Sequence, residues 1–505
     1  MELETLRDKL EKRPSPFLPE DQGGAPFDPR SESRAKGSRV AAAGRPGLQI
    51  GFVGDRDIVS LKTIRYEDHR SSGAGCEGII DIENDLCIPL PGWAIRSGPR
   101  RNIYFEPRKV TAAIVTCGGL CPGLNDIIQN IVYMLLDYGV PDERILGVRY
   151  GLRGFTDRSS PPVPLDRRAV DGIHLRGGTI LGTSRGNADV PEIVSRLDLW
   201  GVNMLFVLGG NGGNAAAEAI NRECREKGVD CAVVAVPKSI DNDILVIDKT
   251  FGFETAVQEA QGAIMAAKVE AMSAYRGVGV VRLMGRQSGF VAMNASLASG
   301  VVDVCLIPEL DFSLDRVLKY VERVVDERGH CVLCVAEGAG QDVMRALAQD
   351  EAATGKMAAE TDASGNPILQ DFGVHLRKQI KKHVPAVDVK YIDPSYMIRS
   401  IPTVTQDRIY CTTLAQGAVH AAFAAYTGIT VGLVNTHFCF LPIGVVIQAP
   451  RLVDPCGRQW SRLVMANGQP DLSDRGCGPC AEEKDCAESV SAESAVAAPG
   501  TGSGE

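Results

Sequence analysis

The order of hydrophobic and polar positions becomes regular after Val110, where short apolar runs alternate with glycine-rich or polar loops and with segments of helical spacing. We assign the apolar runs at 110–115, 204–208, 231–236, 278–283 and 332–336 to strands. Helices are expected after Asn125, over about 288–298 and around 414–425. Repeated strand–loop–helix units predict an α/β fold with mostly parallel sheets.

Three segments lack this periodicity. Residues 13–48 are rich in Pro, Gly, Ser and Arg, which predicts a flexible arm, and residues 341–371 are expected to be an insertion or exposed loops. The tail from residue 472 is rich in Ser, Ala, Gly and Glu and is expected to be disordered. Its thiols, Cys477, Cys480 and Cys486, have no second Cys pair or histidine after them, which favours a reactive or incidental thiol over zinc.

Composition narrows the functional classes. The 505 residues are enough for two or more lobes, and the net charge of -9 disfavours binding to nucleic acid, which needs a basic surface. No apolar run reaches the roughly 18 residues of a membrane-spanning helix. The acidic residues within Met1–Lys12 fit neither a secretory signal nor a plastid transit peptide, so we expect a cytoplasmic protein.

The cysteines indicate reduced thiols. Their number, 15, is odd, and several lie inside apolar runs. Cys231, Cys305, Cys331 and Cys334 are examples. Buried reduced thiols are therefore favoured over a disulfide framework.

The stretch from Val236 to Asp243 carries the strongest chemical signal. It places Lys238, Ser239, Asp241 and Asp243 directly after an apolar strand, which is where open parallel sheets bind ligands. An aspartate beside a cation can accept a proton from a substrate hydroxyl, and a second can help to hold Mg²⁺. In isolation such a cluster is more often a polar turn, so its weight depends on the other motifs.

Two glycine-rich loops follow other strands. Thr116–Gly123 resembles a phosphate-binding loop, but Leu124 and Asn125 stand where a Walker A loop has Lys and Ser or Thr. Gly209–Gly213 resembles a dinucleotide fingerprint, which would indicate an oxidoreductase. That reading needs an acidic residue at the end of the next strand, and this chain has Val236-Pro237-Lys238 there.

Further polar residues follow apolar elements. Arg286 and Arg399 could bind phosphate oxygens, although one such arginine alone is more often a surface charge. Glu337 follows the strand at 332–336 and could accept hydrogen bonds from sugar hydroxyls.

Taken in order, these motifs resemble ATP-dependent 6-phosphofructokinase of the plant and protist subgroup, over roughly residues 110–470. The resemblance rests on the motifs Cys117–Gly123, Gly178–Gly186, Lys238–Asp243, Phe251–Phe253, Met284–Arg286, Ala336–Gly338 and Tyr396–Arg399. It implies the phosphofructokinase fold, with two Rossmann-like lobes, and an allosteric glycolytic enzyme. The implied reaction is ATP-dependent phosphorylation of D-fructose 6-phosphate to fructose 1,6-bisphosphate and ADP.

The resemblance also implies a role for each matching residue. Asp241 would be the general base acting on the sugar 1-hydroxyl, with Arg286 as a second catalytic residue, and Asn211 and Asp243 would serve Mg²⁺. The implied ATP contacts are Gly119, Arg185, Gly186, Gly210, Asn211, Gly212 and Gly213. Glycine at position 212 also implies ATP rather than diphosphate as the phosphoryl donor, because it leaves room for the nucleotide. The implied fructose 6-phosphate contacts are Lys238, Ser239, Asp241, Met284, Gly285, Arg286, Glu337, Tyr396 and Arg399.

The chain departs from the family's pattern in the second glycine loop. Asn211 replaces the usual metal-serving aspartate, and Gly213 replaces a hydroxyl residue. An amide oxygen can still bind a hard cation but brings no charge. Two hypotheses follow. A working kinase is favoured by Asp241, Arg286 and Arg399, and a weakened or inactive regulatory paralogue that binds sugar phosphate is favoured by Asn211 and Gly213.

The resemblance finally gives an expected domain plan and assembly. We expect an N-terminal extension at 1–108, partly disordered, an ATP-binding lobe at 109–250 and a sugar-phosphate-binding lobe at 251–400. A segment at 401–471 would return to the lobes before the tail at 472–505. A homo-oligomer, either dimer or tetramer, is expected. Gly277 stands near where many bacterial members place an arginine that reaches across the interface, which puts that contact in doubt.

Overall fold

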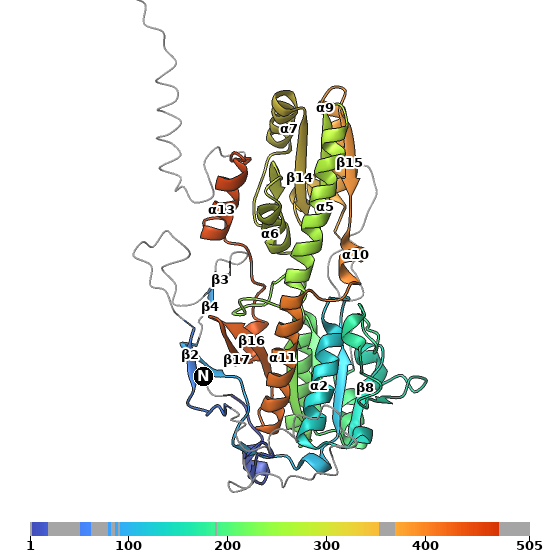
Figure 1. The fold of residues 1–505 in the computed structure, drawn as a ribbon, viewed down its shortest axis with the longest axis vertical. Coiled ribbons are helices and arrows are strands. Elements are labelled where there is room, and N and C mark those ends of the chain that lie inside the picture. Colours follow the sequence, from blue (N-terminus) through green and yellow to red (C-terminus); the bar gives the residue numbers. More distant parts are fainter. Residues whose placement is uncertain are drawn as a thin grey trace, which may run out of the picture.

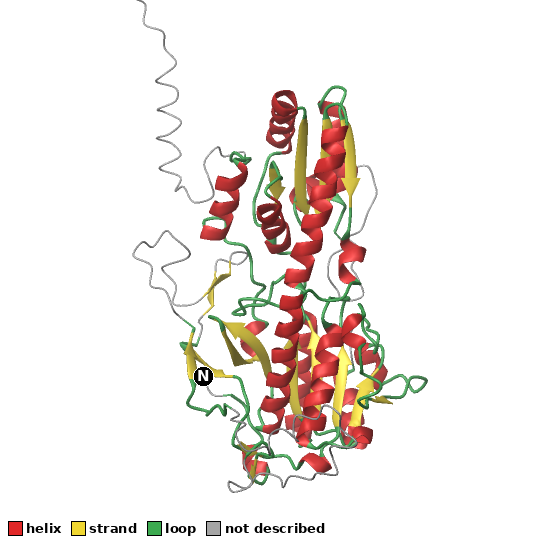
Figure 2. Cartoon of the chain, in the orientation of Figure 1, coloured by secondary structure: helices red, strands yellow, loops and turns green. Residues whose placement is uncertain are grey.

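The computed structural model describes residues 3–18, 51–61, 79–81, 86–88, 91–186, 189–352 and 369–473. These residues form two lobes that follow one another along the long axis of the molecule (Figure 1). Helices pack against the strands of both lobes (Figure 2). The predicted α/β architecture with mostly parallel sheets is confirmed.

The first lobe is built on a nine-stranded sheet. In spatial order its strands are β2 (Ile58–Ser60), β5 (Trp93–Arg96), β17 (His437–Pro442), β16 (Ile429–Val434), β11 (Ala232–Pro237), β10 (Met204–Gly209), β7 (Ala112–Thr116), β8 (Ile145–Val148) and β9 (Val163–Pro164). The five strands from β16 to β8 are parallel, and antiparallel strands continue the sheet on both sides.

Burial on both faces explains the apolar runs of the central strands. Every residue of β7, β10 and β11 is buried, as expected for parallel strands covered by helices on both sides. The helices of this lobe are α2 (Leu124–Tyr138), α3 (Val190–Leu199), α4 (Asn211–Lys227), α11 (Thr405–Phe423) and α12 (Ile443–Val446). Since β7, β10 and β11 are neighbours in the sheet, the loops that follow them emerge side by side.

The second lobe has a four-stranded parallel sheet. Its order is β13 (Val304–Leu306), β14 (His330–Ala336), β12 (Gly277–Leu283) and β15 (Asp388–Ile392). Its helices are α5 (Phe253–Ser273), α6 (Phe290–Ser299), α7 (Leu314–Arg328), α8 (Gln341–Ala352), α9 (Phe372–His383), α10 (Ser395–Arg399) and α13 (Arg458–Asn467). Figure 1 shows α5 running from the junction of the lobes to the far end of the second lobe, and α10 beside that junction.

Short elements complete the described chain. Two-stranded sheets pair β1 (Arg13–Pro14) with β6 (Asn102–Ile103) and β3 (Ile79–Asp81) with β4 (Leu86–Ile88). Single 3-10 turns occupy Arg7–Lys9, Pro107–Lys109, Asp142–Arg144, Gly151–Phe155 and Ile173–Leu175.

Several elements differ from the sequence expectation. Gln341 to Ala352 is helix α8 rather than loop, because Val343 and Met344 pack on the core. The start of the predicted arm is also packed, since Phe17 is buried with its ring centroid 4.7 Å from that of Tyr138. Residues 19–50 of the arm lie outside the described residues.

The start of the predicted C-terminal tail is packed, and the described cysteines are mostly buried free thiols. Leu472 is buried and its carbonyl accepts from the Ser313 N–H at 2.8 Å, so the start of the predicted tail is packed. The rest of the tail from residue 474, with its three cysteines, lies outside the described residues. The predicted burial of Cys231, Cys305, Cys331 and Cys334 as free thiols is confirmed. Cys456 is disulfide-bonded.

Candidate active site

Three loops at the carboxyl ends of β7, β10 and β11 are joined by backbone hydrogen bonds. The Cys117 N–H donates to the Leu208 carbonyl at 2.8 Å, and the Lys238 N–H donates to the Gly209 carbonyl at 2.9 Å. These bonds bring together the loops 116–123, 209–213 and 238–243. The strand-end clustering expected from the sequence is therefore present in the folded chain.

Two cations lie over the first glycine loop. A Cβ atom on Gly118 would lie 3.6 Å from Lys238 Nζ, and one on Gly119 would lie 3.3 Å from a terminal nitrogen of Arg185. Lys238 is buried and so cannot be a solvated surface charge. The 183–186 segment is held against the loop, since Thr183 Oγ1 donates to the Gly118 carbonyl at 2.7 Å. A loop open to backbone approach and flanked by two cations is suited to bind phosphate.

The second glycine loop opens α4. Gly210 is its N-cap and no side chain caps the helix, so its first N–H groups are left for a ligand or water. Gly212 is exposed and a Cβ there would meet nothing within 4 Å, whereas one on Gly213 would lie 3.5 Å from Cys117 Cβ. The positive end of α4 and the two cations thus act on the same region.

Asp243 accepts one hydrogen bond at each of its two carboxylate oxygens. Its carboxylate accepts from Ser239 Oγ and, at 3.3 Å, from Asn211 Nδ2. Burial raises the pKa of Asp243, and the Ser239 hydroxyl opposes that rise. The Oδ1 atom of Asn211 is buried without a hydrogen-bond partner among the described residues. Because a buried polar oxygen without a partner is costly, Asn211 has an acceptor atom to offer to a cation.

Asp241 has different surroundings. Its Oδ1 atom is buried and has no hydrogen-bond partner within the described chain. Burial raises the pKa of Asp241 to about 7, and the charge of Asp243 adds to that rise, whereas the Arg399 guanidinium lowers it. A carboxyl group that titrates near neutrality and has a free oxygen is suited to general base catalysis.

The second lobe reaches Asp241 through the turn after β12. Ser288 Oγ donates to the Asp241 carbonyl at 3.1 Å, and the backbone of Arg286 hydrogen-bonds to the Asp241 carboxylate. Gly285 has a φ of +132°, and a Cβ there would lie 2.4 Å from the Ser288 carbonyl oxygen, so only glycine fits. Arg286 is therefore held beside Asp241 by the backbone of this turn.

The turn after β14 packs on the turn after β12. The Gly338 N–H donates to the Gly285 carbonyl at 2.9 Å, and the Glu337 N–H donates to the Leu283 carbonyl at 2.9 Å. Glu337 is close enough to Asp241 to raise its pKa. Its own carboxylate lies 3.5 Å from the Arg282 guanidinium.

Two predicted sugar contacts differ sharply in the exposure of their side chains. Met284 is only 1% exposed and belongs to the hydrophobic core, so it has backbone atoms alone to offer. Tyr396 is 84% exposed and its ring lies against the Arg399 guanidinium, 5.8 Å from centroid to Cζ. Arg399 itself acts on Asp241 electrostatically and belongs to the cluster.

Sequence reasoning missed residues that support these loops. Thr250 Oγ1 donates to the Ser239 carbonyl, and the Arg451 N–H donates to the Asp243 carbonyl at 2.8 Å. Arg451 is about 200 residues from Asp243 in sequence and leaves no local signal. Ser288 could have been found, because it lies two residues after Arg286.

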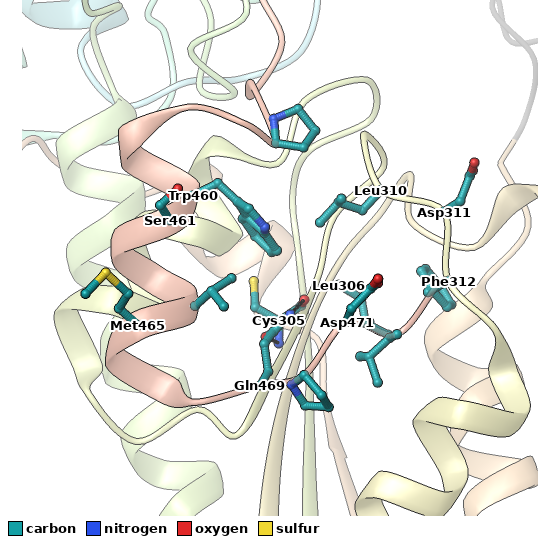
Figure 3. Close-up of a pocket in the computed structure, with 14 residues that line it drawn as sticks. Cys305, Leu306, Leu310, Asp311, Phe312, Trp460, Ser461, Met465, Gln469 and Asp471 are labelled. Atoms are coloured by element: carbon teal, nitrogen blue, oxygen red, sulfur yellow. Dashed lines mark hydrogen bonds between the residues drawn. The ribbon is translucent and has the colours of Figure 1, made fainter. Parts of the chain in front are cut away.

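Other site types find no support in the described ranges. No group of three or more His, Cys, Asp or Glu side chains there is placed to hold a metal alone. None of the described helices is long and apolar enough to cross a bilayer. A separate cavity of about 300 Å³ lies between α13 and the loop after β13, with Trp460 and Leu310 on opposite walls (Figure 3). It contains none of the predicted site residues.

Comparison with known proteins gives consistent matches. Residues 111–422 match the family model described as phosphofructokinase. The chain is 52% identical over 429 residues to ATP-dependent 6-phosphofructokinase 5, chloroplastic, of Arabidopsis thaliana, covering 84% of this chain and 76% of that one. It is 43% identical over 373 residues to ATP-dependent 6-phosphofructokinase of Trypanosoma brucei brucei, covering 72% and 74%.

Solved structures show the same fold. A pyrophosphate-dependent phosphofructokinase from Marinobacter aquaeolei matches with a TM-score of 0.57 at 17% identity, covering 74% of this chain and 94% of that one. Pichia pastoris phosphofructokinase in the T-state matches with a TM-score of 0.55 at 22% identity. This match covers 68% of the chain described here and only 36% of the longer Pichia chain.

Proposed function

The chain belongs to the phosphofructokinase family, and from that premise we propose that it phosphorylates D-fructose 6-phosphate with ATP, giving fructose 1,6-bisphosphate and ADP in glycolysis. One observation carries the proposal. Asp241, a half-buried aspartate whose Oδ1 atom is buried without a partner in the described chain, lies between a glycine loop flanked by Lys238 and Arg185 and the second-lobe residues Arg286, Glu337 and Arg399.

Each group has a task in this reaction. Asp241 takes the proton from the sugar 1-hydroxyl as that oxygen bonds to the γ-phosphorus, and the bond to the β-phosphate oxygen breaks to release ADP. Lys238 and Arg185 act on the phosphoryl oxygens over Gly118 and Gly119. Arg286 and Arg399 supply the positive charge that a sugar phosphate needs on the second-lobe side.

A Mg²⁺ ion fits the chemistry of the site. We propose that Asp243 and Asn211 Oδ1 hold it with ATP oxygens, since the Asn211 oxygen is buried and otherwise has no partner in the described chain. The ion would neutralise charge on the transferred phosphoryl group. The open space at Gly212 supports ATP over diphosphate as donor, because it leaves room for a larger nucleotide.

The test is a direct assay of the purified full-length chain for fructose 1,6-bisphosphate formation, with ATP and diphosphate as alternative donors. We expect turnover with ATP and Mg²⁺. In the Asn211→Asp variant, the restored charge should lower the Mg²⁺ concentration for half-maximal rate by about tenfold, which corresponds to ~1.4 kcal/mol. Absence of turnover in the wild-type chain, with activity in Asn211→Asp, would contradict the proposal. Nothing among the described residues favours the regulatory alternative.

We also propose a homo-oligomer. An apolar stripe runs along the exposed face of α5 and continues past its end, through Met265, Val269, Met272 and Tyr275, which are 39%, 62%, 60% and 80% exposed. The spacing of four and three residues puts the three helical members on one face. Such a stripe supports a protein–protein contact, and a second copy of this chain is the partner that the family premise favours.

We propose a cytoplasmic location, because the acidic residues within Met1–Lys12 do not fit a plastid transit peptide. Two matched relatives carry the word chloroplastic in their names, so the plastid is the alternative to exclude. A fluorescent fusion to the carboxyl end, expressed in a plastid-containing cell, distinguishes the two compartments.

A further inference from the structure

Arg282 stands at the centre of a charge cluster beside the active site. It is the penultimate residue of β12, and its guanidinium lies 3.5 Å from the Glu337 carboxylate at the end of the neighbouring strand β14. Both side chains are only 16% exposed. An ion pair so shielded from solvent is screened less by salt than a surface pair.

The same guanidinium contacts two further carboxylates. Its Nη1 donates to Asp393 Oδ2 at 2.8 Å, and its Nε lies 3.8 Å from Asp371 Oδ1. Three carboxylates around one guanidinium raise the pKa of Arg282, although burial alone would lower it. A planar guanidinium with several N–H donors can serve several acceptors at once, which an ammonium group cannot do in the same geometry.

Two of these three carboxylates, Asp393 and Asp371, accept hydrogen bonds from N–H groups in the first turn of a helix. Asp393 accepts from the Ser395 N–H at 3.0 Å, at the first residue of α10, and α10 ends at Arg399. Asp371 caps α9 by accepting from the Val374 N–H at 3.0 Å, and it also accepts from the Tyr391 hydroxyl at 3.0 Å. Arg282 therefore connects β12, β14, α9 and α10 at the edge of the site.

We propose that Arg282 is a positioning residue for the sugar-phosphate side of the site, holding the Glu337 carboxylate and the start of α10 so that Glu337 and Arg399 face the substrate. The inference rests on the function proposed above. Without the guanidinium, three carboxylates would lie close together without their cation, and their repulsion would move Glu337 and Asp393 apart. ATP binds on the first-lobe side, so its affinity should not depend on Arg282.

The test compares steady-state kinetics of Arg282→Met with wild type. Losing charge-assisted hydrogen bonds should raise the KM for fructose 6-phosphate by about 10- to 100-fold and leave the KM for ATP within about twofold. Arg282→Lys keeps the positive charge but lacks the planar guanidinium with its several N–H donors. Its KM for fructose 6-phosphate should therefore lie between those of wild type and Arg282→Met. A double-mutant cycle with Glu337→Gln should be non-additive if Arg282 acts through Glu337.

The chain offers a matched control at the other end of the same strand. Arg276 directly precedes β12 and pairs with Asp326 at 2.6 Å, far from Glu337. Arg276→Met should leave both KM values unchanged. A parallel rise in both KM values in Arg282→Met, or an unchanged KM for fructose 6-phosphate, would overturn the inference.

A folding defect in the variant and an inactive wild-type chain are each distinguishable from a failure of the positioning role. If Arg282→Met does not fold, Arg282→Lys and Asp393→Asn carry the test, and absence of a selective KM change in both would overturn the inference. Wild-type chain that neither turns over nor binds fructose 6-phosphate by calorimetry contradicts the proposed function itself. An active wild type with an insensitive Arg282 contradicts only the positioning role.

Discussion

Two aspartates separated by one residue have opposite surroundings in this site. Asp243 accepts hydrogen bonds at both oxygens, whereas Asp241 keeps one buried oxygen without a partner in the described chain. The difference supports the proposal that Asp241 transfers the proton and that Asp243 holds the metal ion. The two residues are chemically identical, so only their environments separate the roles.

The pH dependence of the rate follows from Asp241. A general base must be unprotonated, and its pKa is raised to about 7. We expect kcat/KM to fall about tenfold per pH unit below that value. Asp241→Asn should lower kcat by about 10²- to 10⁴-fold at pH 8. Measuring kcat and kcat/KM from pH 5.5 to 9 for wild type and Asp241→Asn checks both expectations. The control is Asp248→Asn, at an exposed position, which should leave the profile unchanged. A flat profile between pH 8 and 6 would be incompatible with this assignment.

The ionised form of Asp241, which catalysis requires, should lower the stability of the folded protein. Because its folded pKa is raised above the ordinary value of 3.8, Asp241 contributes stability below about pH 4 that is lost as the pH rises through 7. Asp241→Asn should therefore melt at a higher temperature than wild type at pH 8, and the difference should shrink toward pH 4. Differential scanning fluorimetry across this range measures it. A variant less stable than wild type at pH 8 would show that Asp241 is stabilised by its neighbours instead.

At the scale of elements, glycines set the entries to two helices beside the site. Gly123 precedes α2 and Gly252 precedes α5, with φ of +106° and +87°. A Cβ on Gly252 would lie 2.4 Å from Cys121 Sγ and 2.9 Å from the Pro122 carbonyl oxygen. The two helix starts thus pack against each other so closely that no side chain fits between them.

Gly252→Ala should be destabilising by about 1–3 kcal/mol, from overpacking and a disfavoured backbone conformation. Gly262 is the matched control within α5, because a Cβ there meets nothing within 4 Å. Gly262→Ala should stabilise the protein by about 0.5–1 kcal/mol. Urea unfolding of both variants gives the comparison. Equal effects of the same sign would refute the packing argument.

Local patterns predicted the central elements and missed the long-range ones. The apolar runs of β7, β10 and β11 and the polar cluster after β11 could be read from the sequence, because strand burial and strand-end chemistry are local. The role of Arg282 could not be predicted from the sequence, since its three carboxylate partners come from segments 55 to 111 residues away. Helix α8 was missed because its short apolar stripe lies among Ala, Asp and Gln.

At the scale of the whole molecule, the α5 stripe should decide the assembly. Val269→Asp with Met272→Asp places two charges on the proposed contact, which a desolvated interface cannot accept without a large cost. We expect the mass in solution to fall toward the 54.0 kDa of one chain. Light scattering after gel filtration measures it. Leu199→Asp, at a 71% exposed position on α3, is the control that should leave the mass unchanged. An unchanged mass in the double variant would exclude this face.

The order of strands has a consequence for how the chain is made. The first sheet takes its central strands from residues before 238 and its neighbours β16 and β17 from residues after 428, while the second-lobe sheet is complete by Ile392. During synthesis the second lobe therefore has all its strands before the first lobe does. One side of β11 therefore has no partner strand until β16, Ile429–Val434, has left the ribosome. The proposed nucleotide site on β7, β10 and β11 thus depends for its support on a segment translated long after its own residues.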